Sequence, residues 1–402
     1  MMVALGHSFA ILQVTGWRKD LTSVLLLFFN GPAAVTMFFV LSGLVLGLSL
    51  RRDNGSFARD TSQFCLRRFF RIYPAYLVCT TAIVAFLLFP SSGAGGSGGF
   101  WFEQYYGLSR HPLTWNSICK NLAMCSFSLN VVTWTLGIEM ICSMLLPFLH
   151  RTASGLSNVW NGLLLLALVL FGVLFPVTNA GAYVYMFFAG YLLPLAGPAL
   201  FSRLQPAFKK YFWIVSGAAL LLLCSRLPGL PENLRAKVVL LTQCFCVLAI
   251  IAALLYGPGL RIYRFLDLPL VRFYGRISYS FYLWHFFCLF LVSRWFFQHL
   301  PLRLMRESPI SCEAGGWFGS TLLATAIAYA SFRLVELPYV RFAKAICSKI
   351  RAVSVKAQAI QVPSLPLYYF VPSSPETTIQ GTPNRSVNMP NLAAKKLLAS
   401  GI

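Results

Sequence analysis

The sequence is poor in charged residues, and acidic residues are the scarcest of these. Only 11% of its 402 residues are charged, with 11 Asp and Glu against 33 Lys and Arg. A soluble globular domain carries roughly 25% charged residues, whereas 57% of this chain is apolar. The shortage of charge therefore excludes a soluble enzyme and predicts an all-α, polytopic integral membrane protein.

The sequence also lacks a cysteine pattern that holds a metal ion or a disulfide framework. None of its 11 cysteines belongs to a C-x-x-C pair or to a spacing typical of zinc ligands. Most lie in apolar segments, where cysteine packs as a small hydrophobic side chain. We therefore expect no metal cofactor.

Apolar segments of roughly 20 residues, the length that spans a hydrocarbon core, recur along the chain. We expect about ten transmembrane helices, near residues 1–16, 31–50, 73–90, 129–149, 158–176, 182–200, 212–226, 238–257, 277–297 and 317–340. The first segment is short and has neither the basic flank nor the cleavage site of a signal peptide. We expect the chain to begin inside a helix whose N-terminal turn is missing.

The net charge of +22 is distributed mainly over alternate loops between these segments. By the positive-inside rule, this bias places both termini in the cytoplasm. Orientation signals account for the basic residues, so we expect membrane lipid and no nucleic acid as a partner. Residues 1–345 form the expected membrane domain, and the polar, proline-rich residues 346–402 form an expected disordered cytoplasmic tail.

His7 is an ionisable side chain inside the first apolar segment. Hydrocarbon offers such a group no hydrogen bond, so it is a functional candidate that faces a bundle interior or a wet cavity. Imidazole also exchanges a proton readily near neutral pH, which suits a general base. A purely structural hydrogen bond between helices is an equally good interpretation.

Three arginines, Arg67, Arg68 and Arg71, lie within about one helical turn before Pro74, so they share a helix face. Guanidinium groups bond phosphate oxygens in pairs, which suits the phosphates of an acyl-coenzyme A. The alternative, favoured by position and residue type alone, is that the arginines bind anionic lipid headgroups and fix the topology.

Glu139 follows Trp134 by five residues in the apolar sequence WTLGIEM. A buried carboxylate needs a partner. It can orient an imidazole, accept a substrate hydroxyl or pair with an arginine from another helix, and structural pairing is at least as good an interpretation as a chemical role.

The segment RISYSFYLWHF places Tyr279, Tyr282 and His285 at spacings of three, along one helix face. Such a polar stripe lines a cavity or bonds across helices. In the last apolar segment, Arg333 and Glu336 have the i, i+3 spacing of an ion pair, which we interpret as structural.

The order of the motifs FFVLSG, RRFFRIYP, WTLGIE, ISYSFYLWH and VELPYVR, after an early helix with a histidine, resembles acyltransferase family 3. Members of this family include the bacterial acetylases of O-antigen and exopolysaccharide. The resemblance covers about residues 1–345 and implies a ten-helix domain of the bacterial cytoplasmic (inner) membrane. It implies the transfer of an acyl group, usually acetyl from cytoplasmic acetyl-CoA, to a hydroxyl of an envelope glycan or lipid-linked acceptor.

The resemblance also implies roles for individual residues. His7 corresponds to the essential histidine of the first helix, and Glu139 to the acidic residue of a W-S-L-x-x-E pattern in which Thr135 replaces serine. The arginine-rich donor site corresponds to Arg67, Arg68 and Arg71, and the expected substrate cavity includes Trp134, Tyr282 and His285. The family's basic residue ahead of the first-helix histidine has no counterpart in this sequence.

A transporter or flippase of a glycan or lipid-linked intermediate is the alternative function. In that case His7, Glu139 and Arg333 are the binding or coupling groups. The sequence shows no pair of Gly- or Pro-broken segments repeated in two halves, the pattern that favours a transporter.

Overall fold

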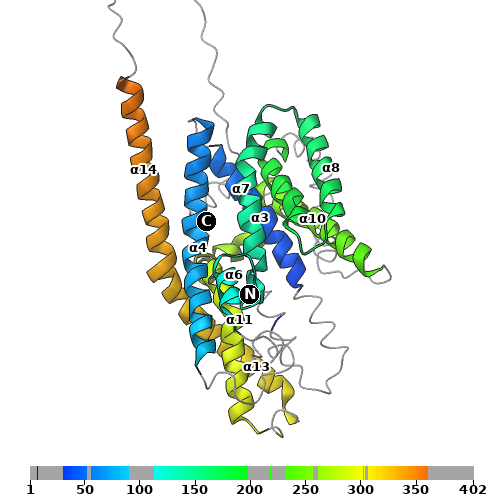
Figure 1. Cartoon of the computed structure of the whole chain (residues 1–402). Helices are drawn as coiled ribbons and strands as arrows, with labels where there is room; N and C mark the ends of the chain where they lie inside the picture. The colour runs from blue at the N-terminus through cyan, green and yellow to red at the C-terminus, as the bar shows by residue number, and fades with distance from the viewer. Residues whose placement is uncertain are drawn as a thin grey trace, which may run out of the picture.

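The protein is a helical bundle in the computed structural model, which describes residues 7, 30–51, 56–89, 113–197, 218, 231–256, 261–301, 303 and 307–360. Figure 1 shows the arrangement of its helices. The residues so described contain no strand. The predicted all-α class is therefore confirmed.

The described part of the bundle contains nine labelled α-helices and a further α-helical segment at residues 184–197, which continues η3. The labelled helices are α3 (Gly31–Leu50), α4 (Phe57–Leu88), α6 (Trp115–Leu122), α7 (Trp134–Ser154), α8 (Asn158–Leu174), α10 (Glu232–Tyr256), α11 (Pro269–His299), α13 (Pro309–Ser331) and α14 (Leu337–Ile360). The shorter elements are the 3-10 helices η2 (Val131–Thr133), η3 (Ala180–Tyr183) and η4 (Arg261–Asp267), and the π-helix η5 (Phe332–Glu336).

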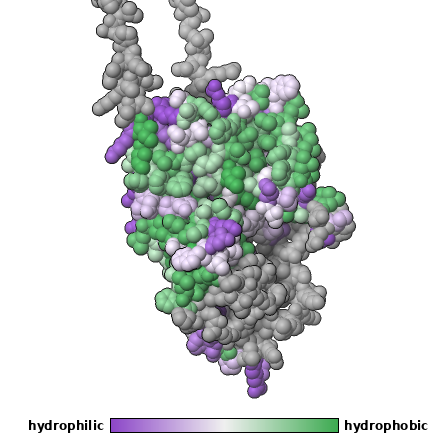
Figure 2. Space-filling model, in the orientation of Figure 1, coloured by the Kyte–Doolittle hydropathy of each residue, from purple (hydrophilic) through white to green (hydrophobic). Residues whose placement is uncertain are grey.

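Six helical segments of the described residues are long and apolar enough to cross a membrane. They are Gly31–Leu50, Phe57–Leu88, Val131–Ser154, Ala180–Gly197, Leu234–Tyr256 and Ala314–Arg351. Apolar side chains that point outward, such as Leu166 and Leu170 of α8 and Phe245 of α10, suit a lipid surface. Figure 2 shows apolar residues over much of the face in view, with hydrophilic residues along its upper edge and in its middle. The chain is thus suited to be an integral membrane protein.

The expected count of about ten spans is not confirmed. The expected spans at 1–16 and 212–226 lie outside the described residues, apart from His7 and Ala218. Helix α8 is an apolar helix of only 17 residues. Helix α11 covers the expected span 277–297 but is not among the six.

Helix α4 begins much earlier than the span expected at 73–90. Its N-cap is Ser56, whose side chain accepts a hydrogen bond from the backbone N–H of Arg59, and Asp60 lies in the first turn, where the helix dipole favours an acid. The helix then continues through Pro74 over 32 residues. The expected loop of arginines is therefore part of a helix that packs against α7, α11 and α14.

Two glycines allow α3 to touch the helix Ala180–Gly197 closely. A Cβ atom added at Gly43 would lie 2.0 Å from the carbonyl oxygen of Phe187, and one added at Gly190 would lie 2.0 Å from the carbonyl oxygen of Val40. Small residues that bring two backbones together are typical of helix pairs in membranes. This contact fixes the position of α3 in the bundle.

The predicted boundary after residue 345 falls inside α14, which continues to Ile360. The sequence change toward polar residues therefore does not coincide with a helix end. In Figure 1, the far end of α14 extends beside α4 as a long straight helix. The remainder of the expected tail lies outside the described residues.

Candidate active site

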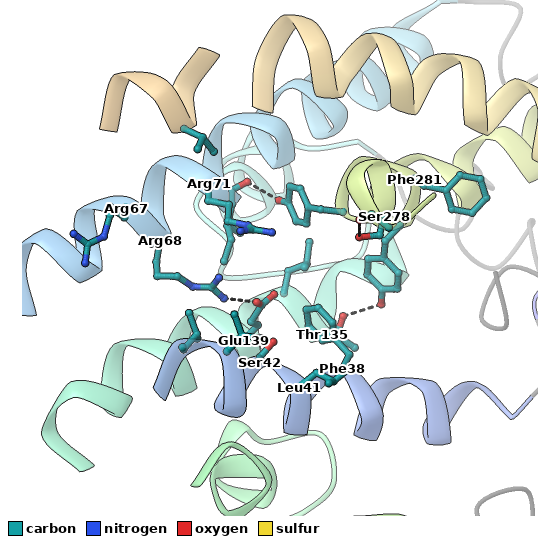
Figure 3. Close-up of a pocket in the computed structure, with 18 of the residues that line it drawn as sticks. Phe38, Leu41, Ser42, Arg67, Arg68, Arg71, Thr135, Glu139, Ser278 and Phe281 are labelled. Atoms are coloured by element: carbon teal, nitrogen blue, oxygen red, sulfur yellow. Dashed lines mark hydrogen bonds and ion pairs between the residues drawn. The ribbon is translucent and has the colours of Figure 1, made fainter. Parts of the chain in front are cut away.

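A cavity of about 560 Å³ lies between α3, α4, α7 and α11, with α14 completing one wall. Its volume falls within the range of small-molecule sites, roughly 300–1,000 Å³. Figure 3 shows the side chains that line it. The cavity brings together residues that are far apart in the sequence and that belong to all five of the motifs found there.

One face of α3 lines the cavity along most of its length. The lining residues recur at intervals of three and four, from Ala34 through Phe38, Ser42 and Leu46 to Ser49. These fifteen helical steps correspond to roughly 22 Å at 1.5 Å per residue. The cavity is therefore an elongated passage along the bundle, with a largely apolar wall on this side.

Arg68 and Glu139 form a buried ion pair across the cavity, between α4 and α7 (Figure 3). Arg68 is 8% exposed and Glu139 is 4% exposed. Of the three partners considered for the Glu139 carboxylate, the structure shows an arginine from another helix. Such a pair holds two helices in register, since either charge alone would be uncompensated in the bundle.

Arg67 and Arg71 line the same end of the cavity as Arg68. Arg71 is attracted electrostatically by Glu336 and Glu139. The exposed side chain of Lys344, from α14, adds another positive charge to the lining. Positive charge therefore exceeds negative charge at this end, which suits a ligand with several anionic groups.

The arginines are thus placed differently from the surface cluster expected from the sequence. All three lie on α4, where Arg68 is buried and paired with Glu139 while Arg67 and Arg71 are half-buried. Lipid headgroups do not account for Arg68, because a guanidinium buried among helices is not offered to the membrane surface. Arg67 and Arg71 line the cavity, where a bound ligand could contact them.

Hydrogen bonds that join α11 to η2 and α7 organise the other end of the cavity. The Tyr282 hydroxyl donates to the carbonyl oxygen of Val132 over 2.6 Å, and it lies 2.7 Å from the hydroxyl oxygen of Thr135. Nδ1–H of His285 donates to the carbonyl oxygen of Tyr282 over 2.6 Å. Tyr282, His285 and Thr135 all line the cavity.

His7 lies next to this end of the cavity. Its ring centroid is 5.7 Å from that of His285 and 5.5 Å from that of Phe286. His7 is not itself a lining residue, but its neighbour His285 is. The structure therefore brings together the two histidines that the sequence places in apolar segments.

Trp134, expected in the substrate cavity, lies outside its lining. Its ring packs in an apolar core cluster, 6.0 Å between centroids from the ring of Tyr183. Successive residues of a helix point about 100° apart, so α7 can present Thr135 and Glu139 to the cavity while Trp134 faces the helix Ala180–Gly197. The structure therefore places Trp134 in the helix packing beside this cavity and not in its wall.

Glu336 has a different environment from the one its spacing predicts. Its carboxylate is buried and accepts a hydrogen bond of 3.0 Å from the Ser280 hydroxyl of α11, whereas Arg333 is exposed. The π-helix η5 causes the difference, because an extra residue per turn shifts the register between the two side chains. Glu336 is thus turned toward α11 and Arg71.

Sequence reasoning missed several lining residues, including Ser42, Lys344 and Ser278. Ser42 stands in the FFVLSG motif, which was noted without a role. No sequence pattern marks Lys344 as a site residue, because only the packing of α14 against α4 brings it to the cavity. Among the residues that the structure describes, no group of three or more His, Cys, Asp or Glu side chains is placed to hold a metal ion.

Comparison with known proteins gives one match. A family model described as an acyltransferase domain matches residues 1–333, which include every lining residue except the three from α14. No curated protein and no solved structure matches the chain.

Proposed function

Because the chain belongs to this acyltransferase family, acyltransferase family 3, we propose that it is a membrane-bound O-acyltransferase that uses acyl-CoA. The acyl group, most simply acetyl, passes from acetyl-CoA to a hydroxyl of an envelope glycan or a lipid-linked acceptor. The proposed location is the bacterial cytoplasmic (inner) membrane, with both termini in the cytoplasm.

The observation that carries the proposal is the single cavity that joins Arg67, Arg68 and Arg71 with the end where His285 and His7 lie. A coenzyme A thioester has anionic phosphates at one end and a reactive carbonyl at the other. An elongated cavity with cations at one end and imidazoles at the other matches this shape and charge distribution.

The predicted topology of the chain indicates from which end of the cavity each substrate enters. Ser49, near the last turn of α3, and Lys344 line the end toward the predicted cytoplasmic loop before α4. A cytoplasmic donor would enter there and place its phosphates against Arg67 and Arg71. The acceptor would reach the thioester from the end where His285 lies.

The transfer requires a base for the acceptor hydroxyl and a fixed position for both substrates. Base catalysis contributes roughly 10²- to 10⁴-fold, and positioning contributes more. Following the family resemblance, we propose an imidazole at the His7 end as the base. Glu139 acts at the other end, where its carboxylate holds the Arg68 guanidinium in the cavity wall.

Acyl transfer by the purified full-length chain tests this function. The chain in detergent or liposomes is incubated with acetyl-CoA labelled in the acetyl group, together with an envelope glycan fraction. Labelled glycan, or free coenzyme A released with time, is the expected result. Movement of a glycan across the liposome membrane without any thioester cleavage would overturn the proposal in favour of a transporter.

A further inference from the structure

His285 has one ring nitrogen that the fold uses and one that it does not use. Nδ1–H donates to the carbonyl oxygen of Tyr282 over 2.6 Å, which fixes the proton on this nitrogen. Nε2 then carries a lone pair and can only accept a hydrogen bond in the neutral ring. Within the described part of the chain, buried Nε2 has no hydrogen-bond partner.

An unsatisfied buried acceptor requires an explanation, because leaving it unpaired costs about 1–3 kcal/mol. His285 is only 4% exposed, so bulk water does not satisfy it. The residue lines the cavity, where a ligand can bring a donor. Nε2 is therefore placed to receive an O–H or N–H group of a bound molecule.

The surroundings of His285 keep its ring in this orientation. Tyr282, whose carbonyl accepts from Nδ1–H, is itself bonded to Val132 of η2 and Thr135 of α7. The Phe281 ring is stacked at 6.2 Å between centroids with an interplanar angle of 9°. A fixed tautomer in a fixed orientation is what a general base needs, and the adjacent His7 is not a lining residue.

We propose that His285, through Nε2, binds the acceptor hydroxyl and is the base that takes its proton during acyl transfer. This inference rests on the proposed acyltransferase function and assigns the base within it. His7 then acts beside the base, as the second imidazole at this end of the cavity. The assignment differs from the one that the sequence resemblance implies, in which His7 is the base.

The step balances with the two substrates alone. The acceptor oxygen forms a bond to the acyl carbon of the thioester while its proton moves to Nε2, which gives a tetrahedral species and an imidazolium. The carbon–sulfur bond then breaks, and Nε2–H returns the proton to the departing thiolate. The products are an ester and a free thiol, and His285 is neutral again.

The variant His285→Asn separates the chemical role from the structural one. The asparagine amide nitrogen stands close to the position of Nδ1 and can still donate to the carbonyl oxygen of Tyr282, but nothing replaces Nε2. We expect this variant, in the full chain, to bind coenzyme A as the wild type does. We expect it to lose about 10²- to 10⁴-fold in the rate of acetyl transfer, and added imidazole to restore part of the rate.

His299→Asn is the matched control. Nδ1 of His299 also bonds to a backbone carbonyl oxygen of its own helix, that of Trp295, over 2.9 Å. This residue is exposed and lies outside the cavity lining. The control variant should transfer acetyl at the wild-type rate.

Wild-type transfer by His285→Asn would overturn the proposal and leave the acyltransferase function standing. Loss of coenzyme A binding together with transfer would also overturn it, because His285 would then belong to the donor site. Should His285→Asn not fold, His285→Gln is judged by the same two measurements, since glutamine cannot take a proton either. Absence of transfer by the wild type would instead count against the proposed function itself.

Discussion

Arg68 of α4 and Glu139 of α7 are 71 residues apart in the sequence and form an ion pair inside the bundle. The pair lies in the wall of the cavity and links the two helices that carry the RRFFRIYP and WTLGIE motifs. Two motifs without an obvious connection in the sequence therefore form one structural unit. Its two charges stabilise the bundle together, and each depends on the other.

Removing one partner of this pair should destabilise the protein strongly. Glu139→Ala leaves Arg68 charged and buried, which we expect to lower the free energy of unfolding by about 3–5 kcal/mol. The double variant Arg68→Met, Glu139→Leu should regain most of this loss. Thermal unfolding in detergent measures both. Asp267→Ala, at an exposed pair with Arg272, is the control and should cost at most about 1 kcal/mol. Equal losses at the two pairs would contradict the prediction.

The cationic end of the cavity should bind the donor through Arg67 and Arg71. Each alanine substitution removes charge-assisted hydrogen bonds worth about 1.5–3 kcal/mol, so we expect coenzyme A to bind roughly 10- to 150-fold more weakly. Calorimetric titration at two salt concentrations measures this, and the difference should shrink at high salt. Arg276→Ala, at an exposed position of α11 outside the lining, is the control. An unchanged affinity for coenzyme A would contradict this prediction and would favour a role of both arginines in membrane topology.

His7 should be required for transfer but not for donor binding. It lies beside His285 and away from the arginines, so His7→Ala should abolish most acetyl transfer while coenzyme A affinity stays at the wild-type value. Initial rates with labelled acetyl-CoA, at matched amounts of folded protein, provide the measurement. A variant that retains the wild-type rate would remove His7 from the mechanism.

The close contact at Gly43 should not tolerate even one methyl group. The added Cβ would lie 2.0 Å from the carbonyl oxygen of Phe187, so α3 must move away from the helix Ala180–Gly197. We expect Gly43→Ala to lower stability by about 1–3 kcal/mol, the usual cost of overpacking. Gly162→Ala of α8, where nothing lies within 4 Å, is the control and should not be destabilised. Similar melting curves for the two variants would contradict the observed contact.

Glu336 should depend on Arg71 and Ser280 rather than on Arg333. We expect Glu336→Gln to lower the free energy of unfolding by about 1–2 kcal/mol, since the buried carboxylate loses its attraction to Arg71. Arg333→Gln should change stability by less than about 0.5 kcal/mol, as at most exposed positions. Chemical denaturation of both variants measures the difference. A larger loss of stability for Arg333→Gln than for Glu336→Gln would support the ion pair that the sequence spacing predicts.

The sequence was most informative where a signal was local. The apolar segment at 31–50 predicts α3 with the bounds that the structure has, because length and hydropathy alone define it. The start of α4 was missed, because its first half is polar and only packing against α7 and α14 makes it part of the bundle. The π-helix η5 was also missed, since a register shift of one residue leaves no periodic signal.

Candidate site residues were recognised by type, whereas their partners were not. A carboxylate in an apolar segment predicts that Glu139 needs a partner, but not that Arg68 is the one. His7 and His285 were each noted as intramembrane histidines, and nothing in one sequence indicates that their rings are neighbours. Trp134 was placed in the cavity through its motif, although the rotation of α7 turns it away. Pairings of this kind depend on how distant helices rotate and pack.

The distance between Arg68 and Glu139 along the chain also affects how the protein is made. A ribosome adds about 5–20 residues per second, so the 71 residues between them correspond to roughly 4–14 seconds of synthesis. Throughout that interval the RRFFRIYP segment of α4 carries three guanidinium groups, and the carboxylate that pairs with one of them has not yet been made. We therefore expect the arginine half of α4 to remain at the polar surface of the bilayer during translation and to pack into the bundle once α7 has been made.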